Sequence, residues 1–378
     1  MAALTEEQSM LKDQASSWAK EQAPVTSFRA MRDSGVETAF EPATWEAMVE
    51  MGWTGILVPE AYGGSDLGYL TFGVVLEELG RQLTASPLFA SALVGVTALK
   101  LGGSEAQKQH YLPKIVDGSE VLTLAVDETP RHAPAHIELA ATKTADGFEL
   151  SGSKTFVIEG MAATSFIVAA RSSGHVGDEA GITLFLVPAD AEGLSRSKIA
   201  TVDSRGYANL SFANVPVSAD AVLGTVESGA GLLTEILDRA RAGLGAEMLG
   251  TASQAFDMTL EYLKTREQFG RVIGSFQALG HRAAGLFTNM ELARSCAEAA
   301  LQAIDADADN VPEMVSLSKC RVGDFLHEMS NQLIQIHGGI GMTDEFDAGF
   351  YLKRARALEA LYGNQAFHRD RYAKLLGF

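Results

Sequence analysis

The sequence predicts a multi-domain α+β fold in which a helical domain, a β-barrel-like domain and a four-helix bundle follow one another. Helical patterns fill the first third of the 378 residues. From residue 121 to 224 the apolar pattern approaches a period of two, which is typical of strands. Long helical patterns then return, and helices in series favour an antiparallel bundle. We therefore expect an N-terminal domain at 1–120, a central domain at 121–224 and a bundle at 225–378.

Capping residues and glycines divide the N-terminal segment into helices. Thr5 and Gln8 have the spacing of a capping box, so a helix is expected from there to about Gln22. Ser104 and Gln107 have the same spacing and predict another helix start. Between them, helices are expected at about 42–51, 69–83 and 87–101.

The central segment is expected to form short strands. It is enriched in β-branched and aromatic residues. Asp146 and Gly147 are the residue types of a two-residue hairpin turn. The expected strands are 122–126, 137–144, 148–150, 156–158, 166–170 and 182–187.

The C-terminal segment begins with an unusually long helical pattern, from about Leu232 to Thr265, which is roughly 50 Å at the usual rise per residue. Gly243, Gly245 and Gly250 lie inside it and would permit a close approach of another helix or of a ligand. Three further helices are expected at about 276–305, 312–336 and 347–376.

Composition limits the classes of function. A formal net charge of −18 argues against nucleic-acid and anionic-membrane partners, which need a basic surface. No apolar run approaches the roughly 20 residues that span a bilayer. Residues 1–7 are acidic and lack the regions of a signal peptide. Cys296 and Cys320 form no CxxC motif, so neither a disulfide framework nor a zinc framework is expected. Together these observations predict a cytoplasmic location.

Two motifs of the C-terminal segment carry most of the functional information. Arg266, Gln268, Phe269 and Gly270 follow the long helix, and an arginine fork matches a pyrophosphate bidentately. The second motif is Gln335-x-x-Gly338-Gly339, where glycines let a polar group approach bare backbone. Alone, each is a common helix terminus. Both together, in this order after a β-domain, favour a binding site over a structural role.

The two motifs resemble the flavin-binding signature of the acyl-CoA dehydrogenase family. Phe276 and Gln277 extend the first motif as in that family, and a Pro59-Glu60-x-x-Gly63-Gly64 loop resembles another family segment. The resemblance covers nearly the whole chain. It implies FAD as cofactor, an acyl-CoA substrate and an electron-transferring flavoprotein as electron acceptor.

The resemblance also implies which residues hold FAD. Arg266 would meet its pyrophosphate, and the Gln335 turn would meet its adenine end. We expect different subunits of an oligomer to donate these two groups. The residues implied are Arg266, Gln268, Phe269, Phe276, Gln277, Gln335, Gly338 and Gly339, with Val126, Glu128, Phe156 and Ile158 from the central domain.

The chain departs from the family at the catalytic base. Family members remove an α-proton with a glutamate, and Gly363 falls on its usual position here. Its backbone N–H could still hold the thioester oxygen, and a glycine enlarges the pocket. A second family position, just before Arg241, holds Ala240. Arg241 would order the active site or assist substrate binding. Glu247, seven residues on, is a minor candidate for a replacement base.

Segments 339–348 and 351–355 resemble a family branch that acts on steroid side-chain or other bulky acyl-CoA esters. Many members of that branch are heterotetramers in which one subunit type lacks the base. The chain would then be a flavin-dependent dehydrogenase within a homotetramer or a heterotetramer. The alternative is a non-catalytic subunit that completes a partner's flavin site. A bundle metalloprotein is disfavoured, because paired Glu-x-x-His motifs are missing.

Overall fold

The computed structural model describes residues 4–378; residues 1–3, where the segment compared with a signal peptide begins, lie outside the described residues. By their contacts the described residues form two compact units. The helical unit holds the chain up to Phe28, Tyr69–Thr84 and Arg241–Phe378. The sheet unit holds Arg29–Gly68 and Ala85–Ala240. The domain boundaries at 120 and 224 stay a prediction. Among the described helices, none combines the length and apolar character needed to cross a membrane.

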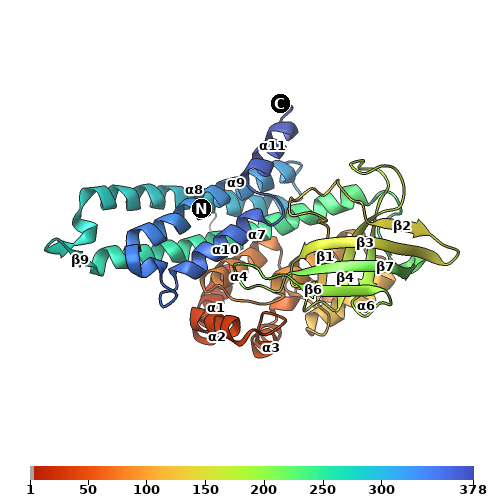
Figure 1. The fold of residues 1–378 in the computed structure, drawn as a ribbon, viewed down its shortest axis with the longest axis horizontal. Helices are drawn as coiled ribbons and strands as arrows, with labels where there is room; N and C mark the ends of the chain where they lie inside the picture. Colours follow the sequence, from red (N-terminus) through yellow and green to blue (C-terminus); the bar gives the residue numbers. More distant parts are fainter. Residues whose placement is uncertain (1–3) are drawn as a thin grey trace. The chain divides into compact units, whose positions relative to one another are not determined.

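The helical unit is built from long helices that run side by side (Figure 1). Helix α7 (Gly229–Thr265) begins in the sheet unit and ends in the helical unit, so it confirms the expected long helix. The capping box of Thr5 and Gln8 is also confirmed. The other helices of this unit are α1 Glu6–Gln22, α4 Tyr69–Arg81, α8 Gln277–Asp305, α9 Val311–His337, α10 Ala348–Ala360 and α11 Gln365–Leu375.

Glycines bring α4 and α7 into backbone contact. A Cβ at Gly250 would lie 1.8 Å from the carbonyl oxygen of Glu77, and a Cβ at Gly80 would lie 2.4 Å from that of Glu247. Thr251 closes the crossing by donating its hydroxyl to the Gly80 carbonyl at 3.2 Å. The glycines of α7 therefore permit a close helix approach, as expected from the sequence.

The last predicted helix, 347–376, is wrong as a single element, because the chain turns between α10 and α11. Tyr362 and Gly363 both have positive φ, of 54° and 104°, which a helix cannot accommodate. Asn364 then starts α11, since its side chain accepts a hydrogen bond from Phe367 N at 3.0 Å. This turn, residues 361–364, is called the α10–α11 turn below.

The sheet unit contains one sheet in the order β6-β7-β3-β2-β4-β5-β8, with β1 paired to β4. The hairpin expected at Asp146 and Gly147 is confirmed, because Lys143 of β2 pairs with Phe148 of β3. The two short strands expected at 148–150 and 156–158 are one strand. The strands are β1 Leu122–Ala125, β2 Ala140–Lys143, β3 Gly147–Val157, β4 Ser165–Arg171, β5 Ile182–Pro188, β6 Leu194–Lys198, β7 Ala208–Ser218 and β8 Val222–Leu223.

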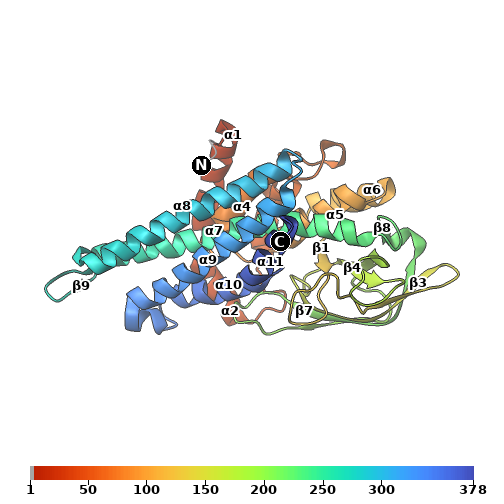
Figure 2. The same ribbon diagram turned by 90° about the horizontal axis from the view of Figure 1, so that it is seen from above.

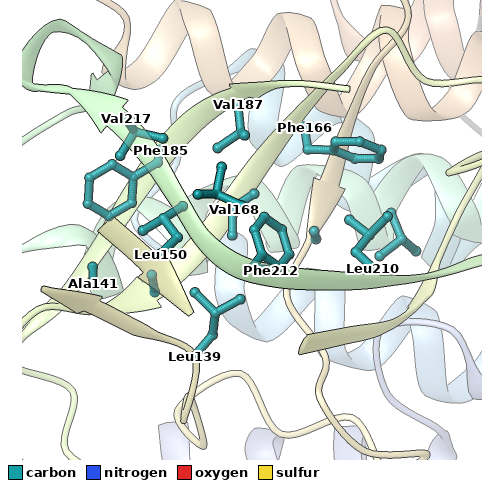
Figure 3. Close-up of a cluster of buried hydrophobic side chains, with 14 of the residues drawn as sticks. Leu139, Ala141, Leu150, Phe166, Val168, Phe185, Val187, Leu210, Phe212 and Val217 are labelled. Carbon is teal, nitrogen blue, oxygen red and sulfur yellow. The ribbon is translucent and has the colours of Figure 1, made fainter. Parts of the chain in front are cut away.

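The core of the sheet unit is apolar and rich in aromatic rings. Figure 3 shows Leu150, Phe185 and Phe212 among the side chains that fill it. Phe148 and Phe185 meet edge to face, with their ring centroids 5.1 Å apart. Strands β6 and β7 were not among the expected strands. Strand β6 lies at the sheet edge and is mostly exposed. Because it buries no face, its sequence does not alternate between apolar and polar residues.

Short helices complete the sheet unit. The helix expected at 87–101 is a π-helical segment, Phe89–Gly95, followed by α5, and the capping box at Ser104 and Gln107 is confirmed. A Cβ at Gly95 would lie 2.9 Å from the Leu122 carbonyl oxygen, so this segment is pressed against β1. Helix α2 was not expected. The chain passes from the helical unit to the sheet unit within this helix. The bounds are α2 Val25–Ser34, α3 Pro42–Glu50, α5 Val96–Gly102 and α6 Glu105–Val116.

Candidate cofactor-binding site

A tight hairpin carries the first motif from α7 to α8. Strands β9 (Glu267–Gln268) and β10 (Arg271–Val272) pair with Gln268 opposite Arg271. The two turn residues, Phe269 and Gly270, have φ of 55° and 77°, as in type I′ turns. Positive φ is unfavourable for a bulky residue such as Phe269, and such strain is commonest at functional sites. The hairpin forms an outer tip of the helical unit, where the end of α7 meets the start of α8 (Figures 1 and 2).

A cavity of about 490 Å³ opens beside this hairpin, within the volume range of cofactor sites. Residues of both motifs of one chain contribute to its wall. The expectation that different subunits donate Arg266 and the Gln335 turn to one dinucleotide stays a prediction. The second motif contributes through the end of α9 and not through the Gln335 side chain itself. The lining residues are Tyr262, Arg266, Gln268, Phe269, Ile273, Phe276, Leu279, Ile336 and His337.

Unpaired and exposed groups mark this cavity. Arg266 is exposed, and within residues 4–378 no acidic side chain pairs with it. The Phe269 side chain is 90% exposed, and its ring meets that of Phe276 edge to face with centroids 6.2 Å apart. Arg271 covers the same Phe276 ring, with its guanidinium carbon 3.9 Å from the ring centroid. The guanidinium group of Arg266 and the rings of Phe269 and Phe276 therefore line one small space that can receive an anion with a flat group attached.

The glycine turn after α9 leaves backbone uncovered. Helix α9 ends at His337, and Gly338 takes φ 61° and ψ −133°, which favours glycine. A Cβ at Gly338 or at Gly339 would meet no atom within 4 Å, so neighbouring protein does not require either glycine. Gln335 is exposed beside them. Gln277, the first residue of α8, is exposed too and does not line the cavity.

The imidazole of His337 is a part of the cavity wall that was not among the expected site residues. Only 3% of His337 is exposed, and its ring stacks on that of Tyr262 with centroids 4.2 Å apart. Its Nδ1 lies 2.7 Å from the Leu333 carbonyl oxygen. Burial lowers the pKa of His337, and this hydrogen bond offsets only part of that effect. A histidine in a flavin motif at the end of a long helix was the signal available in the sequence.

The four expected cofactor residues of the central domain belong to the sheet unit. Phe156 is partly exposed and has φ 51°, again an unfavourable conformation for an aromatic residue. The side chains of Val126 and Ile158 are buried in the unit. Their carbonyl oxygens accept hydrogen bonds, from Lys154 Nζ at 3.0 Å and from Thr123 Oγ1 at 2.7 Å.

The carboxylate of Glu128 forms hydrogen bonds within the sheet unit. Its carboxylate accepts a hydrogen bond from Lys154 Nζ at 2.7 Å and from the backbone N–H groups of Glu138 and Leu139 at 2.7 and 2.9 Å. Burial lowers the pKa of Lys154 to about 8, although Glu128 works in the opposite direction. The pair fastens the loop that follows β1 onto β3.

Arg241, expected to order the active site or assist substrate binding, is buried against the α10–α11 turn. Its Nε donates to the Tyr362 carbonyl oxygen at 3.0 Å, and its guanidinium carbon lies 5.4 Å from the centre of the Phe367 ring. Lys319, also fully buried, donates to the carbonyl oxygens of Leu358 and Glu359 at 2.9 and 3.2 Å. These carbonyls end α10, so Lys319 is a C-terminal cap of that helix.

Gly363 occupies a closed position in this turn. Its N–H donates to the Ala360 carbonyl at 3.2 Å, so this group is already used within the turn and is not available to a thioester oxygen. A Cβ at Gly363 would lie 2.5 Å from Phe367 Cδ1 and 3.0 Å from His368 Nε2. The glycine therefore makes room for these two rings, and the expectation that it enlarges a pocket is corrected.

Glu247, the candidate replacement base, forms a buried ion pair with Arg354 of α10. Its Oε1 accepts hydrogen bonds from the Nε of Arg354 at 3.1 Å and from a terminal nitrogen of the same guanidinium at 2.6 Å. The pair fastens α10 to α7. Accepting a proton would leave the guanidinium of Arg354 without this anionic partner.

Models of three consecutive domains of one protein family match the chain. The N-terminal domain of acyl-CoA dehydrogenase matches residues 5–119, its middle domain residues 128–215 and its C-terminal domain residues 227–377. Mitochondrial isovaleryl-CoA dehydrogenase of Solanum tuberosum is 30% identical over 331 residues, which cover 86% of this chain and 80% of the relative.

Solved structures share the whole fold. A steroid acyl-CoA dehydrogenase variant is 31% identical, with a TM-score of 0.88 over 98% of each chain. The ChsE4-ChsE5 complex from Mycobacterium tuberculosis contains a chain that is 26% identical, with a TM-score of 0.90 over 99% of this chain and 98% of that one. A helical N-terminal part, a middle β-domain and a C-terminal helical bundle, as expected from the sequence, are confirmed.

Proposed function

The chain belongs to the acyl-CoA dehydrogenase family, and we propose that it is one subunit of an FAD-dependent enzyme that oxidises bulky acyl-CoA esters with a base supplied by a partner chain. Members of this family are FAD-dependent flavoproteins. When bound, FAD would supply the acceptor for the hydride that leaves the β-carbon of the thioester. The α-proton needs a carboxylate, and the product is an α,β-unsaturated thioester.

The cavity beside the hairpin is the observation that carries this proposal. The unpaired guanidinium of Arg266 suits a pyrophosphate, and the open backbone at Gly338 and Gly339 suits the groups beside it. Phe269 and Phe276 provide apolar surface for a flat ring. A volume of about 490 Å³ suits one half of a dinucleotide, so we assign this cavity to the adenosine and pyrophosphate half of FAD.

The surroundings of Gly363 support a base from outside the chain. A glutamate there would combine a φ of 104° with a Cβ 2.5 Å from Phe367, so the family's usual carboxylate does not fit this turn. Glu247 is held by Arg354, and we assign it a structural role. Arg241 is a positioning residue for the α10–α11 turn, because its contacts there are to Tyr362 and Phe367.

The substrate and partner are proposed from the similar structures. One of them is a steroid acyl-CoA dehydrogenase, and another is a complex of two named chains. We propose a bulky, steroid-like acyl-CoA ester as substrate, a homologous subunit as partner in a tetramer, and an electron-transferring flavoprotein as electron acceptor. The alternative, a subunit that only completes a partner's flavin site, is favoured by the closed turn at Gly363.

Flavin reduction tests the proposal. The purified chain is recorded by visible spectroscopy, alone and after mixing with a homologous subunit, and then receives butyryl-CoA or a steroid side-chain acyl-CoA. We expect flavin to bleach only in the mixture and faster with the bulky ester. Arg266→Ala should lose the bound flavin. Bleaching by the chain alone would contradict the external base, and a mixture without flavin would contradict the whole assignment.

The alternative is separated by the number of flavins in the mixed oligomer, because a variant of the partner does not distinguish the two cases. Replacing the partner's own base by glutamine should stop bleaching in both cases. A mixed oligomer with two flavins for every four chains supports one shared site for each pair of chains, whereas four flavins would contradict it. Mass spectrometry of the intact oligomer gives this count directly.

A further inference from the structure

A second cavity belongs to the sheet unit and contains none of the residues that the proposed function uses. It has a volume of about 180 Å³. One wall is the end of α2 with the turn after it, within 31–39, and the other is the end of β6 with the loop after it, within 198–205. Among the lining residues Gly35, Lys198 and Ala200 are exposed, whereas Met31 and Arg205 are buried. The cavity is therefore open to solvent on one side and closed by the fold on the other.

The two walls are held together at fixed points. Lys198 Nζ donates a hydrogen bond to the Val36 carbonyl oxygen at 2.9 Å. A Cβ at Gly206 would lie 2.7 Å from the Thr38 carbonyl oxygen, so the loop after β6 is pressed against the turn after α2. Because both walls are anchored, the cavity between them is formed before any ligand arrives, as in most small-molecule sites.

The charges around this cavity are unusual for so acidic a chain. The sequence has 48 acidic and 30 basic residues, so a patch of average composition carries more acidic than basic side chains. Among the described residues that line the cavity, Arg32, Lys198 and Arg205 are basic and none is acidic. The guanidinium of Arg32 meets the exposed carboxylate of Asp33 at 2.7 Å, a pair that solvent screens. The Lys198 ammonium has three donors and gives one to Val36, so two can turn to a ligand. The cavity therefore favours an anion.

Backbone strain occurs on both walls. Ala39 of the first wall and Ser204 of the second have φ of 59° and 55°. The left-handed region is unfavourable for residues with a Cβ, and such strain is commonest at functional sites. The fold thus keeps the shape of this cavity at a cost in free energy.

The size and the apolar walls limit the kind of anion. Met31, Val36 and Ile199 provide apolar surface beside the cations. A volume of about 180 Å³ corresponds to roughly six water molecules at about 30 Å³ each, which is too small for a nucleotide. A solute of about six non-hydrogen atoms with one charged end and one apolar end fits both features. Butyrate has this size and this chemistry, whereas inorganic phosphate leaves the apolar walls unmatched.

We propose that this cavity of the sheet unit binds a short aliphatic carboxylate. Its oxygen atoms accept hydrogen bonds from Lys198 and Arg32, and its chain packs against Met31, Val36 and Ile199. The bound carboxylate ties the turn after α2 to the loop after β6, so it stabilises the folded sheet unit by mass action. The site is independent of the assignment of the other cavity to FAD, whose lining residues belong to the helical unit.

Titration of the natural full chain with butyrate tests the proposal without any turnover. Methyl groups labelled with ¹³C in Met and Ile report binding by NMR. Butyrate should move the resonances of Met31 and Ile199, with a dissociation constant on the order of 1 mM for a solute of this size. The methyl groups of Ile115, buried in α6 of the same unit, should not move.

Two further probes separate charge from shape. Butylammonium has nearly the size of butyrate and the opposite charge, and it should leave the Met31 and Ile199 resonances in place. Inorganic phosphate has the right sign of charge and no chain, and it should bind at least about 10-fold more weakly than butyrate. Equal shifts with butyrate and butylammonium, or no shift with butyrate at about 50 times the expected constant, would overturn the proposal. Phosphate that binds as tightly as butyrate would overturn the choice of a carboxylate.

Variants of the lining cations identify the groups that hold the carboxylate. Lys198→Gln and Arg32→Gln should each weaken butyrate binding about 10-fold, the effect of one charge-assisted hydrogen bond. Lys143→Gln, which replaces an exposed lysine of β2 in the same unit, should bind butyrate like the natural chain. If Lys198→Gln does not fold, Ala200→Glu places a negative charge at an exposed lining position and should also weaken binding. Unchanged affinity in Arg32→Gln together with Ala200→Glu would overturn the proposal, and none of these results bears on FAD.

Discussion

The hairpin after α7 and the α10–α11 turn both lie in the helical unit, yet they are built in opposite ways. At the hairpin, Arg266 is exposed without an acidic partner in the described part of the chain, and in the turn after α9 Gly339 faces open space. At the α10–α11 turn, Arg241 is buried and bonded, and Gly363 leaves no room for a Cβ. The groups of the first region are open to a ligand, whereas those of the second are enclosed by the fold. Under the proposed function, the binding end of the helical unit is open, and the turn where the family's base is expected is closed.

The largest effect is expected from the buried ion pair next to the closed region. Glu247→Gln removes the negative charge that faces Arg354, and we expect the free energy of unfolding to fall by about 3 kcal/mol. Urea denaturation measures it. Asp370→Asn, which breaks the exposed pair with Lys374, should change it by less than about 0.5 kcal/mol. A stable Glu247→Gln protein that loses only turnover would show that Glu247 is a base after all.

A smaller but sharper effect separates the two kinds of glycine. Gly363→Ala should lower the free energy of unfolding by about 2 kcal/mol, because the residue is held at φ 104° and its Cβ would meet Phe367. Gly339→Ala should stay within about 0.5 kcal/mol of the natural chain, since its Cβ meets nothing. Equal stabilities of the two variants would remove the contrast between open and closed regions.

Filling the open side should affect binding and leave folding unchanged. Gly339→Leu places a side chain where the bare backbone is free, and we expect FAD to bind at least about 10-fold more weakly with an unchanged thermal midpoint. Fluorescence quenching of FAD measures the dissociation constant. If Gly339→Leu binds FAD normally, the glycine turn does not face the cofactor.

The pH dependence of stability also reports on the closed region, with an effect that stays small over one pH unit. Burial, and next to it Arg241, lowers the pKa of Lys319 from 10.5 to about 7. Between these values the unfolded chain binds a proton that the folded chain does not, so this group makes the free energy of unfolding rise with pH. The slope cannot exceed about 1.4 kcal/mol per pH unit. Lys319→Met should lose this rise in denaturation at pH 7–10, and identical slopes would contradict it.

The sequence was most informative where the residues of a motif lie close together along the chain. Arg266, Phe269 and Phe276 line one cavity because a hairpin folds a short stretch of chain back on itself, and local sequence determines such a turn. Long helices were predictable from their period, although the stop at Tyr362 and Gly363 was missed. A glycine followed by Asn364, a good N-cap, was the available signal.

Contacts between distant residues explain what sequence reasoning missed. The hydrogen bond from Arg241 to the Tyr362 carbonyl joins residues 121 positions apart, and no local pattern encodes it. The pairing of Glu247 with Arg354 joins residues 107 positions apart. His337 looked like one scattered histidine until α7 and α9 placed it against Tyr262.

Binding of FAD to the Arg266→Ala variant tests the central claim most directly. An exposed arginine without an acidic partner contributes little to the stability of the fold, so its loss should affect binding alone. Titration followed by flavin fluorescence should show binding about 10- to 100-fold weaker than in the natural chain, from the loss of charge-assisted hydrogen bonds, with an unchanged thermal midpoint. Arg282→Ala, an exposed arginine bonded to Gln332 of α9, serves as the control and should bind FAD normally. Equal affinities of Arg266→Ala and the natural chain would contradict the assignment of this cavity to FAD.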